Sequence, residues 1–402
     1  MNKIEKMIKE MCPDGVEYKN INEICEISRG KVISKKYIEE HKGCFPVYSS
    51  QTQNNGELGM IDTYELDGEY ITWTTDGANA GSVFYRNGKF NATNVCGILK
   101  IKKSQKIAAK FIYYVLSIRA PQYVNKAMGN AKLMSNIMET IEVPIPPLTI
   151  QEEIVKILDA FAELTAELTA ELTAREKQYE YYRNSLLHFD KVGGVTWKKI
   201  SEVTNRLKGS KITANEMKTL EVLDGDLKIF AGGKTQVMAK KENCKTLNIH
   251  QLPSVIIKSR GIVDVEFYDK DFAFKQEMWA YTGIKGILST RYLFHYLKTQ
   301  LNILQNKSLI MGSMPQIKLE DTDEMLIPVP SLTVQEKIVA ILDNFEQVCS
   351  DLNIGLPAEL EARQKQYEFY RNSLLTFKSI DEIMAQTDRQ TDRQTDRQTE
   401  LN

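Results

Sequence analysis

Two short polar stretches carry the side chains best suited to binding a ligand. The first is the hydroxyl- and amide-rich run Ser49-Ser50-Gln51-Thr52-Gln53-Asn54-Asn55, and the second is Lys258-Ser259-Arg260. Amide side chains can pair bidentately with adenine, whereas Arg and Lys read guanine and hold phosphates. The first run is explained equally well as a turn-rich surface loop. The two stretches suggest a nucleic-acid surface without deciding it.

Motifs of catalysis and metal binding are missing from the sequence. Gly232-Gly233-Lys234-Thr235 ends like a phosphate-binding loop, but the place of its first glycine is taken by Lys228. The chain contains no dinucleotide-binding glycine motif, serine-hydrolase elbow, zinc-protease motif or deaminase motif. Its six cysteines and four histidines lack metal-like spacing, and the cysteines are expected to be reduced, mostly buried thiols. We expect neither an autonomous enzyme nor a metal site.

The polar stretches belong to two blocks that share one frame. Each block opens with a similar segment, expected to form a strand and then a helix, and contains matching β-rich runs that end in polar loops. The matched pairs are 15–24 with 194–203, 45–56 with 227–238, 69–77 with 253–261, and 127–137 with 310–319. The loops differ: Thr74-Thr75-Asp76 replaces the basic Lys258-Ser259-Arg260. Because loops on a rigid frame carry recognition, the two halves should bind different ligands.

Each block is followed by a copy of one long segment. PPLTIQEEIVKILDAF at 146–161 returns as PSLTVQEKIVAILDNF at 330–345, and AREKQYEYYRNSLLHF at 174–189 returns as ARQKQYEFYRNSLLTF at 362–377. Apolar and aromatic residues follow an a/d heptad seam through the first copy, which predicts a helix of roughly 55 Å. The second copy carries four extra residues and the run Gly355-Leu356-Pro357, where we expect a break. The copies should pair as two antiparallel helices.

Charge is distributed unevenly along the chain. The net charge is −1, yet residues 191–260 hold 14 Lys or Arg against 6 Asp or Glu. A basic block beside acidic helices is typical of a phosphate-binding domain, although charged runs are usually plain solvated surface. No apolar run is long enough to cross a membrane, and the N-terminus lacks the apolar core of a signal peptide. A cytoplasmic protein is expected.

Together these features resemble the specificity (S) subunit of type I restriction-modification systems. The resemblance covers nearly the whole chain and is carried by the duplicated IPPL-x-x-Q opening at 145–151 (329–335 in the second copy, with Ser331 for one Pro) and by the QYEYYRNSLL and QYEFYRNSLL endings. It implies a non-catalytic chain whose two target-recognition domains each read one half of a split, asymmetric DNA target. The spacer helices would separate the halves and dock two adenine-methylating (M) subunits, and two ATP-driven restriction and translocation (R) subunits would complete the complex. The chain itself would bind no cofactor, while S-adenosylmethionine, ATP and Mg would belong to the partners.

The resemblance and the loops together define the expected organisation. We expect an α+β chain with two tandem β-rich domains separated and followed by long paired helices. The expected segments are a first recognition domain at 1–145, a central spacer helix at 146–189, a second recognition domain at 190–328, a C-terminal spacer helix at 329–378, and a disordered TDRQ-repeat tail at 379–402.

The candidate site residues form two sets. The DNA-binding candidates are Ser49, Ser50, Gln51, Gln53, Asn54, Asn55, Thr74, Thr75, Asn79, Lys132, Lys234, Thr235, Gln236, Lys258, Ser259, Arg260 and Gln316. The candidates for binding a partner subunit are Gln151, Gln178, Tyr179, Tyr182, Arg183, Asn184, Gln335, Gln366, Tyr367, Tyr370, Arg371 and Asn372.

One repeat suggests how the spacer length is set. Residues 163–174 are three Glu-Leu-Thr-Ala units, and one unit more or less would change a continuous helix by roughly 6 Å. The spacing of the half-sites would then change by one or two base pairs while their bases stay the same. Two other classes of protein remain open: a stand-alone two-domain DNA-binding regulator, which leaves the duplicated helix endings without a purpose, and a coiled-coil scaffold, which leaves the diverged loops unexplained.

Overall fold

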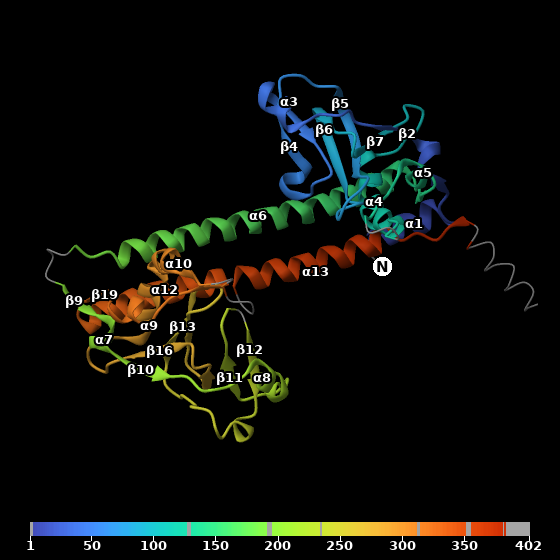
Figure 1. Ribbon diagram of the computed structural model, residues 1–402. Helices are drawn as coiled ribbons and strands as arrows, with labels where there is room; N and C mark the ends of the chain where they lie inside the picture. The colour runs from blue at the N-terminus through green and yellow to red at the C-terminus, as the bar shows by residue number, and fades with distance from the viewer. Residues whose placement is uncertain are drawn as a thin grey trace, which may run out of the picture. The chain divides into compact units, whose positions relative to one another are not determined.

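The computed structural model describes residues 3–126, 130–190, 195–233, 235–311, 314–350, 355–380 and 382, with no side-chain description at 309–311 and 314. The chain forms two compact units. Unit one consists of residues 1–167 and 361–402, and unit two of residues 168–360. Each unit therefore contains one sheet-bearing block and parts of the long helices (Figure 1).

Unit one is built on a six-stranded sheet. The strand order is β2-β7-β5-β6-β3-β4, and all neighbours are antiparallel except β6 and β3. The bounds are β2 (Cys25–Arg29), β3 (Lys42–Tyr48), β4 (Glu57–Ile61), β5 (Leu66–Thr74), β6 (Val83–Ala92) and β7 (Cys96–Ile101). β5 carries buried residues on both faces at its end, from Tyr70 to Thr74, because the sheet is covered there on both sides.

Unit two repeats this strand order in two pieces. A four-stranded sheet has the order β10-β16-β13-β14, and a three-stranded sheet has the order β12-β11-β15. The β11–β15 pair is parallel, like β3–β6. The bounds are β10 (Thr204–Lys208), β11 (Leu227–Phe230), β12 (Gln236–Ala239), β13 (Ser254–Lys258), β14 (Asp264–Tyr268), β15 (Phe272–Phe274) and β16 (Trp279–Gly283). The polar run 269–271 divides one long strand into β14 and β15, which splits the sheet.

Short elements complete both units, and the expected strand-then-helix openings are confirmed. In unit one, β1 (Tyr18–Asn20) leads into α2 (Ile21–Ile24) and pairs with β8 (Glu142–Pro144); in unit two, β9 (Thr196–Lys199) leads into α7 (Ile200–Val203) and pairs with β19 (Leu326–Val329). The remaining elements are α1 (Lys3–Met11), α3 (Lys35–Glu40), η1 (Gln53–Gly56), α5 (Ser135–Met138), η2 (Ala120–Tyr123), α8 (Ala214–Leu220), η3 (Lys241–Asn243), α10 (Leu301–Lys307), β17 (Leu309–Met311), β18 (Met314–Gln316) and α11 (Glu320–Asp323).

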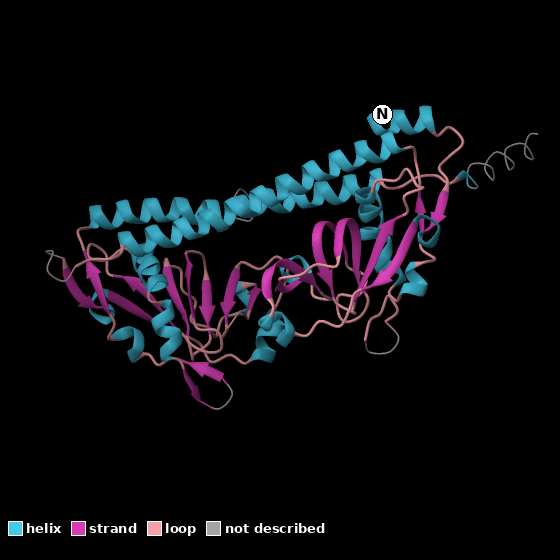
Figure 2. Cartoon of the chain, turned by 90° about the horizontal axis from the view of Figure 1, so that it is seen from above, coloured by secondary structure: helices cyan, strands magenta, loops and turns pink. Residues whose placement is uncertain are grey.

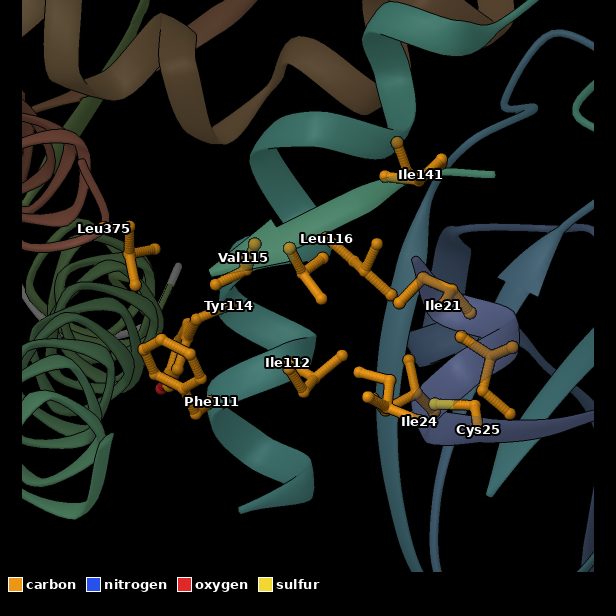
Figure 3. Packing of buried hydrophobic residues seen from close by; sticks show 14 of the residues in the cluster. Ile21, Ile24, Cys25, Phe111, Ile112, Tyr114, Val115, Leu116, Ile141 and Leu375 are labelled. Atoms are coloured by element: carbon orange, nitrogen blue, oxygen red, sulfur yellow. The ribbon is translucent and has the colours of Figure 1, made fainter. Parts of the chain in front are cut away.

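One buried helix joins sheet and spacer helices in each unit. In unit one this is α4 (Ala109–Arg119), with six buried residues. Figure 3 shows Phe111 and Tyr114 directed toward Leu375, and Ile112 and Leu116 on the side of α2. In unit two, α9 (Thr290–Thr299) buries six consecutive residues. The aromatic residues of these helices belong to the core, as expected, and burial of one such side chain contributes about 1.5–3 kcal/mol.

The long helices confirm the expected α+β class with paired helices. α6 (Leu148–Leu186) is one continuous helix of 39 residues. Its first half packs antiparallel against α13 (Leu356–Leu374) in unit one, and its second half against α12 (Leu332–Ser350) in unit two (Figures 1 and 2). The break in the second copy is also confirmed, since α12 ends at Ser350 and α13 begins with Leu356 and Pro357.

Three further expectations concern single features of the chain. All six cysteines are free, and Cys25, Cys96, Cys244 and Cys349 are buried. Among the described helices, none combines the length and the apolar character needed to span a bilayer. The TDRQ repeats lie outside the described residues.

Candidate functional site

In unit one, three loops meet at one edge of the sheet. The loop that follows β3 runs from Ser49 to Gly56, and the hydroxyl of Thr74, at the end of β5, donates to the Ser50 carbonyl at 3.4 Å. The loop after β5 is joined to a third segment by a β-bridge between Asp76 and Lys132. Tertiary folding thus brings together candidate residues from three separate parts of the sequence.

The side chains of this edge divide into exposed and buried groups. Gln53, Asn54, Asn55, Asn79 and Lys132 are exposed, and Ser49, Ser50 and Gln51 are half-buried. Thr74 and Thr75 are each only 1% exposed. The Thr75 hydroxyl donates to the Val95 carbonyl at 3.0 Å. The two threonines therefore hold the loops in place, whereas the amides of Gln53, Asn54, Asn55 and Asn79 face solvent.

Unit two forms the same edge with other residues. A β-bridge joins Arg260 to Gln316, and Arg260 Nε donates to Gln316 Oε1 at 3.1 Å. This bridge corresponds in position to the Asp76–Lys132 bridge of unit one. Thr235, Gln236 and Arg260 are exposed, Gln316 is half-buried, and Lys234 lies outside the described residues.

Two of the basic-loop candidates in unit two are buried. Lys258 is 8% exposed, and its Nζ lies 2.6 Å from Glu266 Oε2. Ser259 is 1% exposed and donates to the Glu277 carbonyl at 2.7 Å. In this conformation Lys258 and Ser259 support the loop, and Arg260 is the member of the run that reaches solvent.

A groove beside Gln236 contains residues that sequence reasoning missed. Its volume is about 620 Å³, and its lining includes Lys228, Tyr268 and Lys270. Lys228 Nζ lies 5.0 Å from the centre of the Tyr268 ring. The sequence gives no clear signal for this groove, because Tyr268 and Lys270 stand among the acidic residues Glu266, Asp269 and Asp271.

The glutamines near the start of the two spacer copies are buried and hydrogen-bond to the backbone of their own unit. Gln151 and Gln335 are both 0% exposed. Gln151 Oε1 accepts from the Ala108 N–H at 3.0 Å, just before α4, and its Nε2 donates to the Pro146 carbonyl at 2.7 Å. Gln335 bonds Ser289, just before α9, at 2.8 Å and Pro330 at 2.9 Å in the same way. Burial takes both glutamines out of any contact surface in this conformation.

The endings of the spacer copies form a surface that occurs once in each unit. In unit two, Tyr179 and Tyr182 stack on Phe345 of α12; in unit one, Tyr367 and Tyr370 pack on Phe161 of α6. Next to each pair stands a strongly exposed aromatic side chain, Tyr181 at 67% and Phe369 at 68%. The endings thus place an exposed aromatic residue at the same position of both copies.

The polar candidates of the endings are matched as well. Gln178 accepts from Arg175 and Gln366 from Arg363, at 3.1 and 3.2 Å. Asn184 and Asn372 are exposed. The Nε atoms of Arg183 and Arg371 are buried without a hydrogen-bond partner in the structure. Each guanidinium lies over the ring of a tyrosine one turn earlier, Arg183 at 5.2 Å from Tyr179 and Arg371 at 5.5 Å from Tyr367.

Comparison with known proteins decides the family. The family model described as type I restriction modification DNA specificity domain matches residues 13–175 and 193–362. The chain belongs to the family of type I restriction-modification specificity subunits.

Relatives agree with this assignment. The specificity subunit is 35% identical over 367 residues to a putative type I specificity subunit of Mycoplasma pneumoniae, covering 88% of this chain and 96% of that protein. It is 49% identical over 173 residues, 42% of this chain and 52% of the relative, to the specificity subunit of a type I restriction enzyme from the same organism. A crystal structure of the S subunit from M. genitalium shares its fold, with a TM-score of 0.63 at 15% identity, covering 90% of this chain and 96% of that one. The specificity subunit is the non-catalytic member of its system.

One cluster in the specificity subunit has metal-like composition. The ligand atoms of His295, Asp343 and Glu346 lie within 4.8 Å of one another. However, Arg291 Nε lies 2.7 Å from Asp343 Oδ1, and Arg291 also pairs with Glu346. Because this guanidinium already compensates both carboxylates, the arrangement is that of a buried ion-pair network.

His295 completes that network as a neutral side chain. Its Nε2 lies 2.7 Å from Asp343 Oδ1, and its Nδ1 lies 3.4 Å from the Tyr179 hydroxyl. Burial lowers the pKa of His295 to about 4, and the bond to Asp343 offsets this only partly. A neutral ring with Nε2–H donating to Asp343 and Nδ1 accepting from Tyr179 satisfies both contacts.

Proposed function

We propose that each unit of the specificity subunit reads one half of a split, asymmetric target in double-stranded DNA. The observation that carries this proposal is that the same three-loop edge occurs twice with different exposed side chains. Unit one presents Gln53, Asn54 and Asn55, whose amides suit adenine, and unit two presents Arg260, which suits guanine. Buried Thr74, Thr75, Lys258 and Ser259 hold the loops, and Lys132, Thr235 and Gln236 would contact the backbone or the bases.

The two helical surfaces are proposed to dock two adenine-methylating subunits. Each surface combines one exposed aromatic side chain, Tyr181 or Phe369, with a neighbouring tyrosine, Tyr182 or Tyr370, and a half-buried arginine, Arg183 or Arg371. Aromatic residues and Arg carry most of the binding energy in protein interfaces. The remaining candidates of this surface are Gln178, Tyr179, Asn184, Gln366, Tyr367 and Asn372. Two restriction subunits would join the assembly in the cytoplasm, and S-adenosylmethionine, ATP and Mg would be bound by the partner subunits.

This docking proposal has a direct test. Tyr181→Ser and Phe369→Ser should each weaken one methylation-subunit site by about tenfold or more. Native mass spectrometry would then record one bound subunit in place of two, and none for the double variant. The control is Tyr37→Ser, since Tyr37 is 40% exposed but lies on α3 of the first sheet block. Full occupancy of the double variant would contradict the assigned surface.

The segment boundaries form part of the same proposal. Recognition domains at 1–145 and 190–328 would be separated by the helix at 146–189 and followed by the helix at 329–378. α6 supports this division because its 39 residues continue without a break from one unit into the other. A continuous helix of this kind would set the spacing between the half-sites.

Methylation mapping tests the recognition function. The chain is expressed in a host together with its methylation subunit, and N6-methyladenine is mapped by single-molecule sequencing of the host DNA. We expect a split motif with methyladenine in both halves, which is lost when the gene of this chain is deleted. A complex that binds DNA without any such motif would contradict this function and favour a stand-alone DNA-binding regulator.

A further inference from the structure

The loop between β3 and β4 has an unusual backbone. Asn54 and Asn55 have φ of 49° and 53°, and Gly56 follows with φ of 79°. Asn54 and Asn55 are the only non-glycine residues with positive φ among the described part of the chain. Two consecutive left-handed residues that are not glycine cost free energy and persist only where the surroundings enforce them. Something must hold this loop.

Arg86 on β6 is the side chain that holds the loop from below. Its Nη2 donates to the Asn55 carbonyl at 2.8 Å, and its Nε donates to the Thr72 hydroxyl at 3.2 Å. The Ser49 N–H donates to the Gly56 carbonyl at 2.9 Å and closes the base of the loop. Asn55, the second left-handed residue, is thus tied directly to the sheet.

The guanidinium of Arg86 is buried without a carboxylate. Arg86 is 3% exposed and lies 3.5 Å from the centre of the Tyr48 ring. No ion pair among the described residues involves Arg86, and its Nη1 is buried without a hydrogen-bond partner. A buried charge without a carboxylate is costly, so the position of Arg86 under a polar loop points to a role beyond packing.

Unit two shows what the same position holds under a shorter loop. Arg86 pairs with Tyr70 across β6 and β5, as Tyr268 pairs with Ser254 across β14 and β13. Tyr268 packs edge-on against Phe230 with ring centres 5.4 Å apart. The loop there is closed within 231–235 by a bond from the Ala231 N–H to the Thr235 carbonyl at 2.9 Å. The arginine therefore accompanies the longer loop.

We propose that Arg86 is a specificity-determining positioning residue that holds the Gln51–Gly56 loop in one conformation for base reading. This inference rests on the proposed function of unit one. Arg86 itself touches no base: it fixes the exposed amides of Gln53, Asn54 and Asn55 in register. Its charge faces the rings of Tyr48 and Phe84, whose centres lie 3.5 and 4.7 Å from the guanidinium carbon.

The test compares two substitutions in the full chain, expressed with its methylation subunit. Arg86→Tyr introduces the residue that unit two carries at this position and replaces the cation–π contact with Tyr48 by a ring contact like that of Tyr268 with Phe230. Thr72→Val removes only the hydroxyl that orients Arg86 and tests the idea even if Arg86→Tyr does not fold. We expect both to relax base preference about tenfold in one half of the methylated motif. The other half and the spacing should be unchanged.

Hydrogen exchange supplies a second measurement, because a general loss of stability would raise the exchange rate of all sheet amides and not of the loop alone. Amides of residues 49–57 should exchange faster in both variants, whereas the remaining sheet amides should not. The control is Thr204→Val in unit two, which removes another buried threonine hydroxyl, bonded to the Ile200 carbonyl at 2.7 Å. Unchanged loop exchange and an unchanged motif in both variants would overturn the proposal. A wild-type chain that yields no methylated motif would overturn the proposed function. If the loop of both variants still exchanged faster in that case, Arg86 would have a structural role only, and its role in specificity would be refuted.

Discussion

At the scale of residues, an aspartate on the spacer helix of each unit binds different side chains at matching positions of the buried helix. Asp159 accepts from Lys110 and Tyr114 of α4, at 2.7 and 2.5 Å. The corresponding Asp343 accepts from Arg291 and lies within hydrogen-bond distance of His295, both at 2.7 Å. In each unit, one aspartate on a spacer helix thus contacts two side chains of the buried helix, and these side chains differ between the units. The repeat keeps the acceptor and exchanges the donors.

This exchange predicts a pH dependence that belongs to unit two alone. Because burial lowers the pKa of His295 to about 4 from an ordinary value of 6.5, the unfolded chain binds a proton that the folded chain does not. The contribution of His295 to the free energy of unfolding of unit two should be fully present above pH 6.5. The free energy of unfolding should fall by on the order of 3 kcal/mol as the pH decreases toward 4.

Urea unfolding of the full chain at several pH values, with hydrogen exchange to separate the units, would measure this loss. His295→Tyr copies the Tyr114 arrangement of unit one and should remove this part of the pH dependence. An unchanged slope of stability against pH in His295→Tyr would show that His295 is not its source.

The hydrogen bonds of the two buried glutamines lead to a second prediction. Gln335→Leu keeps the size of the side chain but removes the hydrogen-bond partner of the Ser289 N–H and of the Ile287 and Pro330 carbonyls. We expect a loss of about 3 kcal/mol in the stability of unit two, because each unsatisfied buried group costs about 1–3 kcal/mol. Denaturant unfolding would measure it, with Gln347→Leu on the exposed face of α12 as the control. Equal stability of the two variants would contradict a stabilising role of the Gln335 hydrogen bonds.

At the scale of elements, α6 is the part of the chain shared by both units. The boundary between the units falls between Glu167 and Leu168, inside the three Glu-Leu-Thr-Ala units. Only four residues of α6, from Ile150 to Leu158, are buried, whereas Leu164, Leu168 and Leu172 of the repeats are half-buried. The middle of the helix can therefore change in length with little effect on either core.

Inserting one Glu-Leu-Thr-Ala unit after Ala174 tests this. The helix would lengthen by about 6 Å and turn by about 40° beyond one full turn. We expect the gap between the half-sites to grow by one or two base pairs with the bases of both halves retained. Methylation mapping would read the gap, and Glu167→Gln, which keeps the length, should not alter it. A change in half-site bases at constant spacing would refute the role of α6 as a spacer.

At the scale of the whole molecule, unit one is assembled from both ends of the chain, whereas unit two is a continuous segment. The Val16 N–H donates to the Lys378 carbonyl at 3.0 Å, and the Tyr18 hydroxyl donates to the Phe377 carbonyl at 2.9 Å. The segments that open and close unit one thus meet in space. Both sheet blocks begin and end in the same way, since β1 pairs with β8 in unit one and β9 pairs with β19 in unit two.

Exchange of a recognition domain gives the prediction at this scale. Residues 25–141 are replaced by a second copy of residues 204–325, cut at corresponding points before β2 and β10 and before β8 and β19. The chimaera should carry two identical reading edges, and its methylated motif should therefore become symmetric. Methylation mapping would show this, with deletion of the chimaeric gene as control. A motif that still has two different halves would contradict independent reading by the two units.

The sequence by itself determined the tandem organisation, the long helices, their break, and the core helices α4 and α9. These follow from local signals: a duplicated segment, a heptad seam, a Gly-Leu-Pro interruption and dense apolar runs. The family also followed from the sequence, because its motifs occur twice at matching places.

Burial and loop support were decided only by the tertiary structure. Nothing local distinguishes Gln151 or Lys258 from an exposed polar residue, because their partners Ala108 and Glu266 come from other parts of the chain. Arg86 stands in a strand that gives no sign of the loop it holds, since Asn55 lies 31 residues away. Sequence patterns report the neighbours along the chain, whereas a buried hydrogen bond depends on neighbours in space.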